Sequence, residues 1–457
     1  MRVGKLVLNC SFALALVTIA ASAAPAPKEE TLLWRVAEKR VSAEISSWDL
    51  TKLLEQIALA TSWQIYLEPD TKYTVSTKFK DLPPGEALRM LLGDLSFALL
   101  PQTNGPAKLF VFRTTMQEAT KLIKAPPRID PTSKPIPNEL VVTLKPGGRI
   151  DELAKKYGAR IVGRMDGSNA YRLSFDSAEA AEAARQALKN DPSVESVGNN
   201  YWMRQPDNPD SLAASSTLPF DLKERKAGDC QNQIVGLIDT PVQSTGTSLD
   251  KFLLPGVTVA DGTVKVDPSQ PTHGTTMLET ILHGVSLKGK ETSVKILPID
   301  VYGNNTTTTT FDVAHGIVEA ANRGATVINL SLGSAGDSEL LRDTVQKTSD
   351  QGVLLLAAAG NDPGTTPTYP AAYPQVMAVT AGTRDGAIAS YANSGDFVDL
   401  VAPGTSIVPY NGESWLVSGT SAATAYASGL AAAFSDCTQT TTTQLAAKLR
   451  ALLPVKK

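Results

Sequence analysis

The second half of the chain alternates short apolar runs with amphipathic segments. The apolar runs are typical of strands buried on both faces, and they fall at 233–238, 294–299, 325–331, 353–358, 376–380 and 397–401. Apolar residues at helical spacing predict helices over 311–323, 337–350, 420–434 and 442–453. This alternation predicts an α/β domain over 218–457, in which helices cover both faces of a mostly parallel sheet.

Two smaller α+β patterns precede this domain. Residues 41–114 follow the order β-α-β-β-α-β-β, with Ser47 placed to cap the first helix and Pro83-Pro84 to open the second. Residues 138–204 follow the order βαββαβ of a ferredoxin-like unit. Between them, residues 119–137 contain five prolines and few large apolar residues, a composition typical of a semi-rigid linker.

The N-terminus has the features of a secretory signal. Residues 1–23 combine the basic Arg2 and Lys5 with an apolar core and a final Ala-Ser-Ala. A membrane anchor is the alternative, but the apolar core is short for a span of about 20 residues. The pattern predicts an exported protein, secreted or periplasmic.

Length and charge limit the other possibilities. A chain of 457 residues is too long for one hydrophobic core, which agrees with several domains. The net charge of −3 gives no reason to expect nucleic acid as a partner.

Four reactive or polar side chains stand at the ends of predicted elements in the last domain. Asp239 ends a strand, His273 begins a helix, Asn361 follows a strand, and Ser421 lies in the first turn of a small-residue helix. In a parallel sheet these ends share one edge. There Ser421 can attack a carbonyl and His273 can take its proton, while Asp239 stabilises the imidazolium and Asn361 donates to the oxyanion.

Each of these residues also has a structural interpretation when it is taken alone. Asp239 suits a helix cap after a strand, and Asn361 suits a turn. The other two histidines, His283 and His315, match no motif and are interpreted as structural.

The motifs around the four residues resemble those of subtilisin-like serine proteases (subtilases). The matching pieces are Ile238-Asp239-Thr240, His273-Gly274-Thr275, Val327 to Gly333, Ala357 to Asn361, Ala402-Pro403-Gly404 and Gly419-Thr420-Ser421. The resemblance implies a serine endopeptidase that acts on proteins or peptides through an Asp239–His273–Ser421 triad and an acyl-enzyme, with Asn361 as oxyanion donor. It also implies a cis bond at Tyr369-Pro370.

The resemblance further implies two walls for the substrate pocket. One wall holds Ser331, Leu332 and Gly333, and the other holds Ala358, Ala359 and Gly360. Because most of these residues are small, we expect a pocket open to large apolar side chains.

Three positions depart from the family pattern. Pro241 replaces the glycine that usually follows the aspartate motif, Thr276 replaces a second histidine, and Ala425 replaces a proline. Proline fixes φ and lacks an amide donor, so the turn after Asp239 must differ. A pseudoprotease that keeps the fold as a binding scaffold is therefore an alternative.

The two smaller domains carry resemblances of their own. Residues 138–204 resemble the inhibitory propeptide of subtilases, which implies a self-processing zymogen whose segment Asn199 to Arg204 lies in the substrate cleft. A permanent structural domain is the alternative. Residues 41–114 resemble the short N-terminal domain of secretins and TonB-dependent receptors, which implies a cell-envelope protein as partner.

Cys230 and Cys437 are the two cysteines outside the signal segment. Cys230 precedes the strand that runs toward Asp239, and Cys437 follows the helix that runs back from Ser421, so both should lie opposite the active site. We expect a disulfide between them in an exported protein, with two buried thiols as the alternative. We expect no cofactor and no metal; calcium is common in the family, but no clear carboxylate-rich loop is present.

Overall fold

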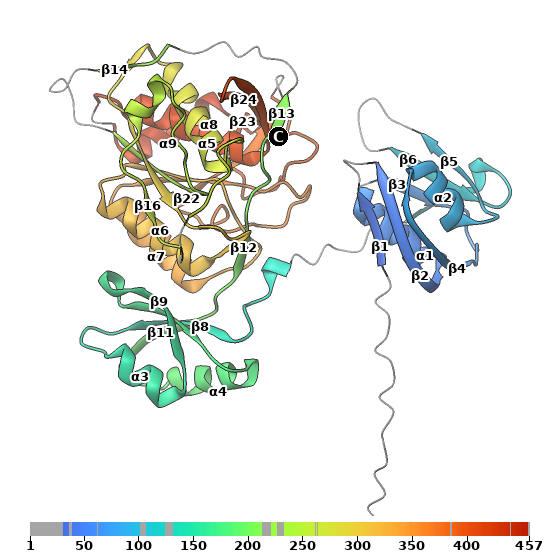
Figure 1. The fold of residues 1–457 in the computed structure, drawn as a ribbon, viewed down its shortest axis with the longest axis horizontal. Coiled ribbons are helices and arrows are strands. Elements are labelled where there is room, and N and C mark those ends of the chain that lie inside the picture. Colours follow the sequence, from blue (N-terminus) through green and yellow to red (C-terminus); the bar gives the residue numbers. More distant parts are fainter. Residues whose placement is uncertain are drawn as a thin grey trace, which may run out of the picture. The chain divides into compact units, whose positions relative to one another are not determined.

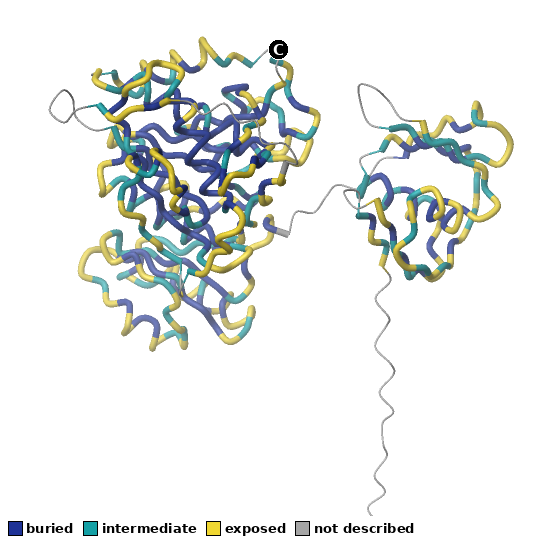
Figure 2. The backbone as a smooth tube through the Cα atoms, turned by 45° about the horizontal axis from the view of Figure 1, so that its top comes forward, coloured by how far each residue is buried: buried dark blue, intermediate teal, exposed yellow. Residues whose placement is uncertain are grey.

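The computed structural model describes residues 31–455, apart from gaps at 36–38, 62, 101–106, 124–130, 213–220, 226–232, 261, 263, 384–385 and 439. The chain forms two compact units, residues 1–128 and 129–457 (Figure 1). Figure 2 shows a buried interior in each unit. No helix of the described residues is long and apolar enough to cross a membrane.

The first unit contains two small sheets and two helices. One sheet has the order β1-β2-β4 and the other β5-β6-β3-β7. The strands are β1 (Thr31–Arg35), β2 (Arg40–Asp49), β3 (Gln64–Leu67), β4 (Thr74–Leu82), β5 (Ser96–Leu100), β6 (Lys108–Phe112) and β7 (Lys121–Ile123). The helices α1 (Leu50–Thr61) and α2 (Pro84–Leu92) bury Leu53, Leu54, Leu88 and Leu91 in a core of this unit's own.

The order of elements matches the prediction, but its details need correction. The folded unit is wider than 41–114, because β1 precedes that range and β7 falls within the expected linker. Ser47 does not cap the first helix: it lies inside β2, and the carboxylate of Asp49 accepts the Lys52 amide at 3.0 Å instead.

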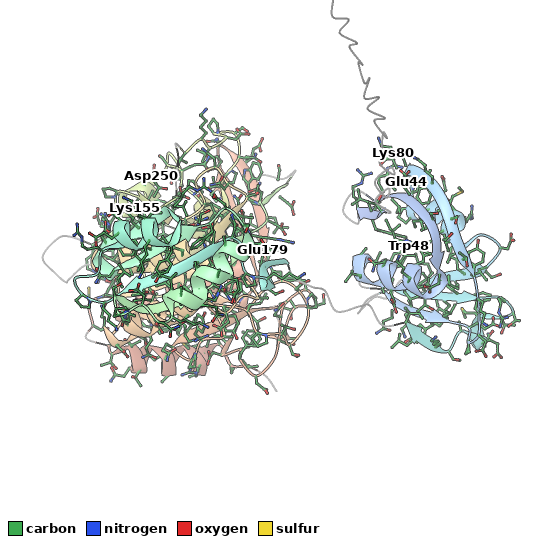
Figure 3. All side chains as sticks on the ribbon, turned by 90° about the horizontal axis from the view of Figure 1, so that it is seen from below. Glu44, Trp48, Lys80, Lys155, Glu179 and Asp250 are labelled. Atoms are coloured by element: carbon green, nitrogen blue, oxygen red, sulfur yellow. The ribbon has the colours of Figure 1, made fainter. Side chains whose placement is uncertain are left out.

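The second unit begins with a ferredoxin-like domain. Its elements are β8 (Glu139–Leu144), α3 (Ile150–Tyr157), β9 (Arg160–Met165), β10 (Ala170–Ser174), α4 (Ala178–Leu188) and β11 (Val194–Gly198). The antiparallel sheet has the order β11-β8-β10-β9, which confirms the predicted unit. Charged residues such as Lys155 and Glu179 lie on the exposed sides of its helices (Figure 3).

The free face of this antiparallel sheet packs on the large domain. Val141, Met165 and Ala170 form one buried cluster with Phe311 of the large domain. Residues before β8 contribute as well, since Pro135 bridges Tyr201 and the hydroxyl of Thr132 accepts the Ala335 amide. Part of the expected linker is therefore packed structure.

The large domain is built on a parallel sheet, as predicted, which has seven strands in the described residues because the short β16 adds to the six expected ones. Its order is β16-β18-β15-β20-β21-β22-β23. The strands are β16 (Val257–Thr258), β18 (Lys295–Asp300), β15 (Ile234–Asp239), β20 (Val327–Leu330), β21 (Leu354–Ala358), β22 (Val376–Gly382) and β23 (Leu400–Pro403).

Helices cover both faces of this sheet (Figure 1). One face carries α5 (His273–Ser286), α8 (Thr420–Ser435) and α9 (Thr442–Leu452), and the other carries α6 (Thr310–Asn322) and α7 (Glu339–Asp350). Helices α5 and α8 approach closely, because a Cβ on Gly429 would lie 2.1 Å from the carbonyl oxygen of Ile281. The small residues of α8 thus allow the two helices that carry His273 and Ser421 to touch.

Several short strands lie outside the main sheet. The hairpin β24 (Thr405–Tyr410) and β25 (Glu413–Ser418) leads directly into α8. Strands β12 (Trp202–Arg204) and β13 (Asp210–Leu212) follow the ferredoxin-like domain, and β19 (Thr307–Thr309) precedes α6. Strands β14 (Lys223–Glu224) and β17 (Glu291–Thr292) form a small parallel pair.

Candidate active site

Three elements bring the predicted triad residues to the carboxyl edge of the sheet. Asp239 is the last residue of β15, His273 the first of α5 and Ser421 the second of α8. His273 Nδ1 lies 2.7 Å from Asp239 Oδ1 and 3.0 Å from Oδ2, and both residues are buried. An imidazole that donates from Nδ1 to a carboxylate keeps Nε2 as its proton acceptor.

Asp239 is further held by the turn that follows it. Its Oδ1 accepts the Thr240 amide at 2.7 Å, while the Thr240 hydroxyl accepts the Gly274 amide at 2.8 Å. The carboxylate and the first turn of α5 are therefore tied through one residue. Hydrogen bonds of this kind offset the cost of burying a charge.

Ser421 is placed at the site, but its hydroxyl does not bond to His273 in the described structure. Ser421 Oγ donates to the carbonyl oxygen of Ser331 at 3.2 Å, and Ser331 Oγ donates to the Ser421 carbonyl at 3.1 Å. Proton transfer to His273 requires the hydroxyl to turn away from Ser331, which is a change of rotamer.

Asn361 lies beside the turn that carries Ser421. Its Oδ1 accepts the Thr420 amide at 2.9 Å and the Thr420 hydroxyl at 3.1 Å, so its Nδ2 is left to donate elsewhere. Gly419 has a φ of +143°, and a Cβ there would lie 2.8 Å from Asn361 Nδ2. Only glycine fits between Asn361 and the start of α8.

The two predicted pocket walls follow neighbouring strands. Ser331, Leu332 and Gly333 come after β20, while Ala358 to Gly360 end and follow β21. Leu330 pairs with Ala357 across these strands. Ser334 and Tyr369 exchange backbone hydrogen bonds of 2.9 and 2.7 Å next to the walls, and the Tyr369-Pro370 bond is cis as expected.

Comparison with known proteins identifies the families that two stretches of the chain match. Residues 231–453 match the subtilase family, and residues 123–200 match the fervidolysin N-terminal prodomain. Residues 231–453 belong to the subtilase family. The chain thus combines a subtilase domain with a fervidolysin-like prodomain, which supports the expected class of subtilisin-like serine endopeptidase.

Two relatives and one solved structure illustrate the similarity. A thermophilic serine proteinase of Bacillus sp. (strain AK1) is 32% identical over 269 residues, covering 55% of this chain and 65% of that protein. The minor extracellular protease Epr of Bacillus subtilis is 30% identical over 262 residues, covering 53% of this chain and 40% of that protein. The chain therefore spans less than two thirds of either relative.

The solved structure is that of fervidolysin from Fervidobacterium pennivorans, described as a keratinolytic enzyme related to subtilisin. It superposes with a TM-score of 0.51 at 20% identity, covering 65% of this chain and 54% of fervidolysin. Identity this low supports the shared fold alone. The prodomain match begins at residue 123, ahead of the predicted start at 138, in agreement with the packed residues before β8.

Two buried polar residues near the predicted triad, Asp300 and Gln243, were not expected from the sequence. Asp300 ends β18 directly beside Asp239, and its carboxylate accepts the amides of Tyr302 and Gly303 and the hydroxyl of Thr258. Burial raises the pKa of Asp300, and the negative charge of Asp239 adds to that rise. Gln243 lies four residues after Asp239 and contacts the start of α5. No motif marks either residue, because their roles depend on loops that meet only in the fold.

The remaining candidates lie apart from the triad. His283 in α5 contacts the ring of Tyr426 in α8 edge-on, and burial lowers the pKa of the histidine. His315 lies on α6, and burial lowers its pKa too. In the described part of the chain, no group of three or more His, Cys, Asp or Glu side chains is arranged to hold a metal ion. Cys437 follows α8 as expected, but Cys230 is outside the described residues, so the disulfide stays a prediction.

Proposed function

We propose that this chain is an exported serine endopeptidase, made as a zymogen that cleaves itself between its prodomain and its subtilase domain. Asp239, His273 and Ser421 act as the triad, and Asn361 donates to the oxyanion. The observation that carries the proposal is the path of residues 202–212, which pairs with the subtilase domain on both sides of a five-residue stretch.

On the first side, β12 pairs antiparallel with β19. Met203 faces Thr308 in this register, and the Gln205 amide donates to the Thr306 carbonyl at 2.8 Å. The Met203 side chain is fully buried in the same apolar cluster as Ile238 and Tyr302 of the subtilase domain. The Tyr302 hydroxyl donates to the Arg204 carbonyl at 3.0 Å. An extended peptide is thus held by backbone bonds and one buried side chain.

On the second side, β13 pairs antiparallel with β25. Asp210 faces Leu416 and Ser211 faces Trp415. Strand β25 ends at Ser418, three residues before Ser421. Residues 205–209 therefore connect β12, which pairs with β19, to β13, which pairs with the strand β25 just before Ser421. The bond to be cut is proposed to lie in this stretch, between Gln205 and Asp210.

The chemistry follows from the groups already placed at the site. Ser421 Oγ attacks a carbonyl carbon while His273 Nε2 takes its proton, and Asp239 stabilises the imidazolium. Asn361 Nδ2 and the Ser421 amide, which lies in the first turn of α8, are the donors for the oxyanion. His273 then protonates the leaving amine, and water hydrolyses the acyl-enzyme by the same steps in reverse. Protein and peptide chains are the proposed substrates.

The same contacts account for inhibition before release. While residues 202–212 are paired with β19 and β25, another substrate cannot bind along these two strands. Buried contacts support it, since Asn200 of the prodomain accepts the Phe311 amide at 3.1 Å and Arg172 lies 3.7 Å from Asp312. We therefore propose the prodomain as the enzyme's own inhibitor.

Self-cleavage is tested with the purified chain lacking residues 1–23, compared with its Ser421→Ala variant. We expect the parent to split, with a new N-terminus between residues 206 and 210 by mass and terminal sequencing, and the variant to stay whole. A parent that stays whole for days and does not react with a fluorophosphonate would refute the protease proposal. That result would favour the pseudoprotease alternative.

A second proposal concerns the N-terminal unit and its location. Residues 31–123 form a compact unit with its own core, and residues 41–114 have the order β-α-β-β-α-β-β on which the resemblance to the secretin and TonB short domains rests. We propose that it binds a cell-envelope protein in an exported molecule. Pull-down from envelope extracts with the Ser421→Ala chain, with and without residues 24–128, tests this proposal. Equal recovery of every partner by both forms would argue against it.

A further inference from the structure

The first turn of α5 is anchored by the side chain of Gln243. This residue is buried, and its Oε1 accepts the Thr272 amide at 2.7 Å and the Thr275 hydroxyl at 3.1 Å. The backbone N–H of Gln243 donates to the Thr275 hydroxyl oxygen at 2.9 Å. His273 lies between these two threonines, so Gln243 is bonded to the backbone before it, at Thr272, and to the side chain of Thr275 after it.

The other half of the Gln243 side chain holds a loop. Its Nε2 donates to the carbonyl oxygens of Asp267 and Gln270 at 3.0 and 3.1 Å. A side-chain amide has two donor hydrogens and two acceptor sites, and all four are used here. The partners leave one orientation of the amide, because two carbonyls must meet the NH₂ group and an N–H must meet the oxygen.

The start of α5, which Gln243 anchors, also holds the turn that contains Pro241. Proline offers no amide to hold the turn after Asp239. The turn is held from the α5 side instead: the Thr272 hydroxyl donates to the Pro241 carbonyl at 2.5 Å, and the Gly274 amide donates to the Thr240 hydroxyl. The two backbones touch, since a Cβ on Gly274 would lie 2.3 Å from the Thr240 carbonyl oxygen.

We propose that Gln243 is a positioning residue for the triad, which sets the place of His273 relative to Asp239. The inference rests on the proposed protease function and adds a residue outside the six matching motifs. Each bond of the Gln243 side chain goes to the start of α5 or to the 267–270 loop, so its loss displaces His273 without removing a substrate contact. Small misplacements of a catalytic group lower the rate of chemistry more than they change substrate binding.

The test replaces Gln243 by methionine, which keeps the size of the side chain and removes its hydrogen bonds. Two rates are measured: first-order self-cleavage of the full chain, and peptide hydrolysis by the processed enzyme. We expect both self-cleavage and kcat to fall about 10- to 100-fold, with KM within about twofold of the parent. Gln243→Glu retains oxygen acceptors for Thr272 and Thr275 but loses the donors, and it should fall between the parent and Gln243→Met.

Thr292→Val is the matched control for lost buried hydrogen bonding. Thr292 is buried in β17, and its hydroxyl donates to Asp436 at 2.8 Å and accepts the Val294 amide. This variant should lower the melting temperature and leave kcat unchanged. Parental kcat in Gln243→Met, or an equal loss of kcat in Thr292→Val, would overturn the positioning role while the protease proposal stands. A parent without self-cleavage or hydrolysis would overturn both.

Discussion

Asn200 is the residue whose removal should most directly weaken self-inhibition. It is fully buried between the prodomain and the first turn of α6. Its Oδ1 accepts the Thr310 hydroxyl at 2.9 Å and the Phe311 amide at 3.1 Å, and its Nδ2 donates to Glu139 at 2.9 Å. Glu139 is fixed in turn by two hydrogen bonds from Arg172. An alanine at position 200 removes all three bonds of the amide.

The cost to binding comes from the bonds that cross between the domains. The Phe311 amide is one of the helix N-terminal donors without a partner inside α6, and losing a side-chain acceptor there costs about 1 kcal/mol. Losing the neutral bond to Thr310 costs about 1 kcal/mol more. The Glu139 bond lies within the prodomain, so we leave it out of the sum. A total of about 2 kcal/mol corresponds to roughly 30-fold weaker inhibition.

The assay is the inhibition constant of the prodomain, residues 129–204, added as a separate chain to processed enzyme. Asn190→Ala is the control, because Asn190 is exposed on the same domain and its side chain donates to the Gln186 carbonyl of α4. Circular dichroism of each prodomain checks that both variants keep their fold. An inhibition constant that changes less than about threefold for Asn200→Ala would refute the assignment of binding energy to these two bonds.

Two further predictions concern the buried acid of α5 and the turn before α8. Glu279 is buried, and its Oε2 has no hydrogen-bond partner. Burial raises the pKa of this carboxyl to about 8, and the negative charge of Asp250 (labelled in Figure 3) makes a smaller contribution to the rise. The unfolded chain releases that proton near pH 4.5 and the folded chain does not, so the free energy of unfolding should fall from pH 4.5 to 8, by on the order of 5 kcal/mol. In the Ser421→Ala background, Glu279→Gln should flatten the dependence of the melting temperature on pH in this window; parallel curves would contradict it. Gly419→Ala should lower kcat at least about 100-fold by displacing Asn361, whereas Gly352→Ala, with a similarly positive φ and open space around its Cβ, should not. Equal kcat losses in the two glycine variants would show that backbone strain, and not the clash with Asn361, is responsible.

Local pattern was enough to predict the elements that carry the site. Strands buried on both faces and helices of 3.6-residue period are properties of neighbouring residues, so the predicted ranges of β15, β21 and α8 fall within a few positions of their observed bounds. For α5 the sequence predicted the start at His273, where the helix begins. The ends of those elements then placed Asp239, His273, Asn361 and Ser421 at one edge, because parallel strands share their carboxyl side. The ferredoxin-like order of the prodomain could be predicted from the sequence for the same reason, because it depends on the periodicity of neighbouring residues.

Contacts between distant segments were decided only in the folded chain. The hydrogen bonds of Gln243 join three segments: the turn after Asp239, the 267–270 loop and the first turn of α5. The hydrogen bond of Ser421 to Ser331 is set by a side-chain rotamer. The pairing of β12 with β19 and of β13 with β25 depends on edges that exist only after the subtilase domain has formed. Short strands of three residues carry little periodicity, and buried polar side chains find partners by spatial fit, so neither leaves a signal in the sequence.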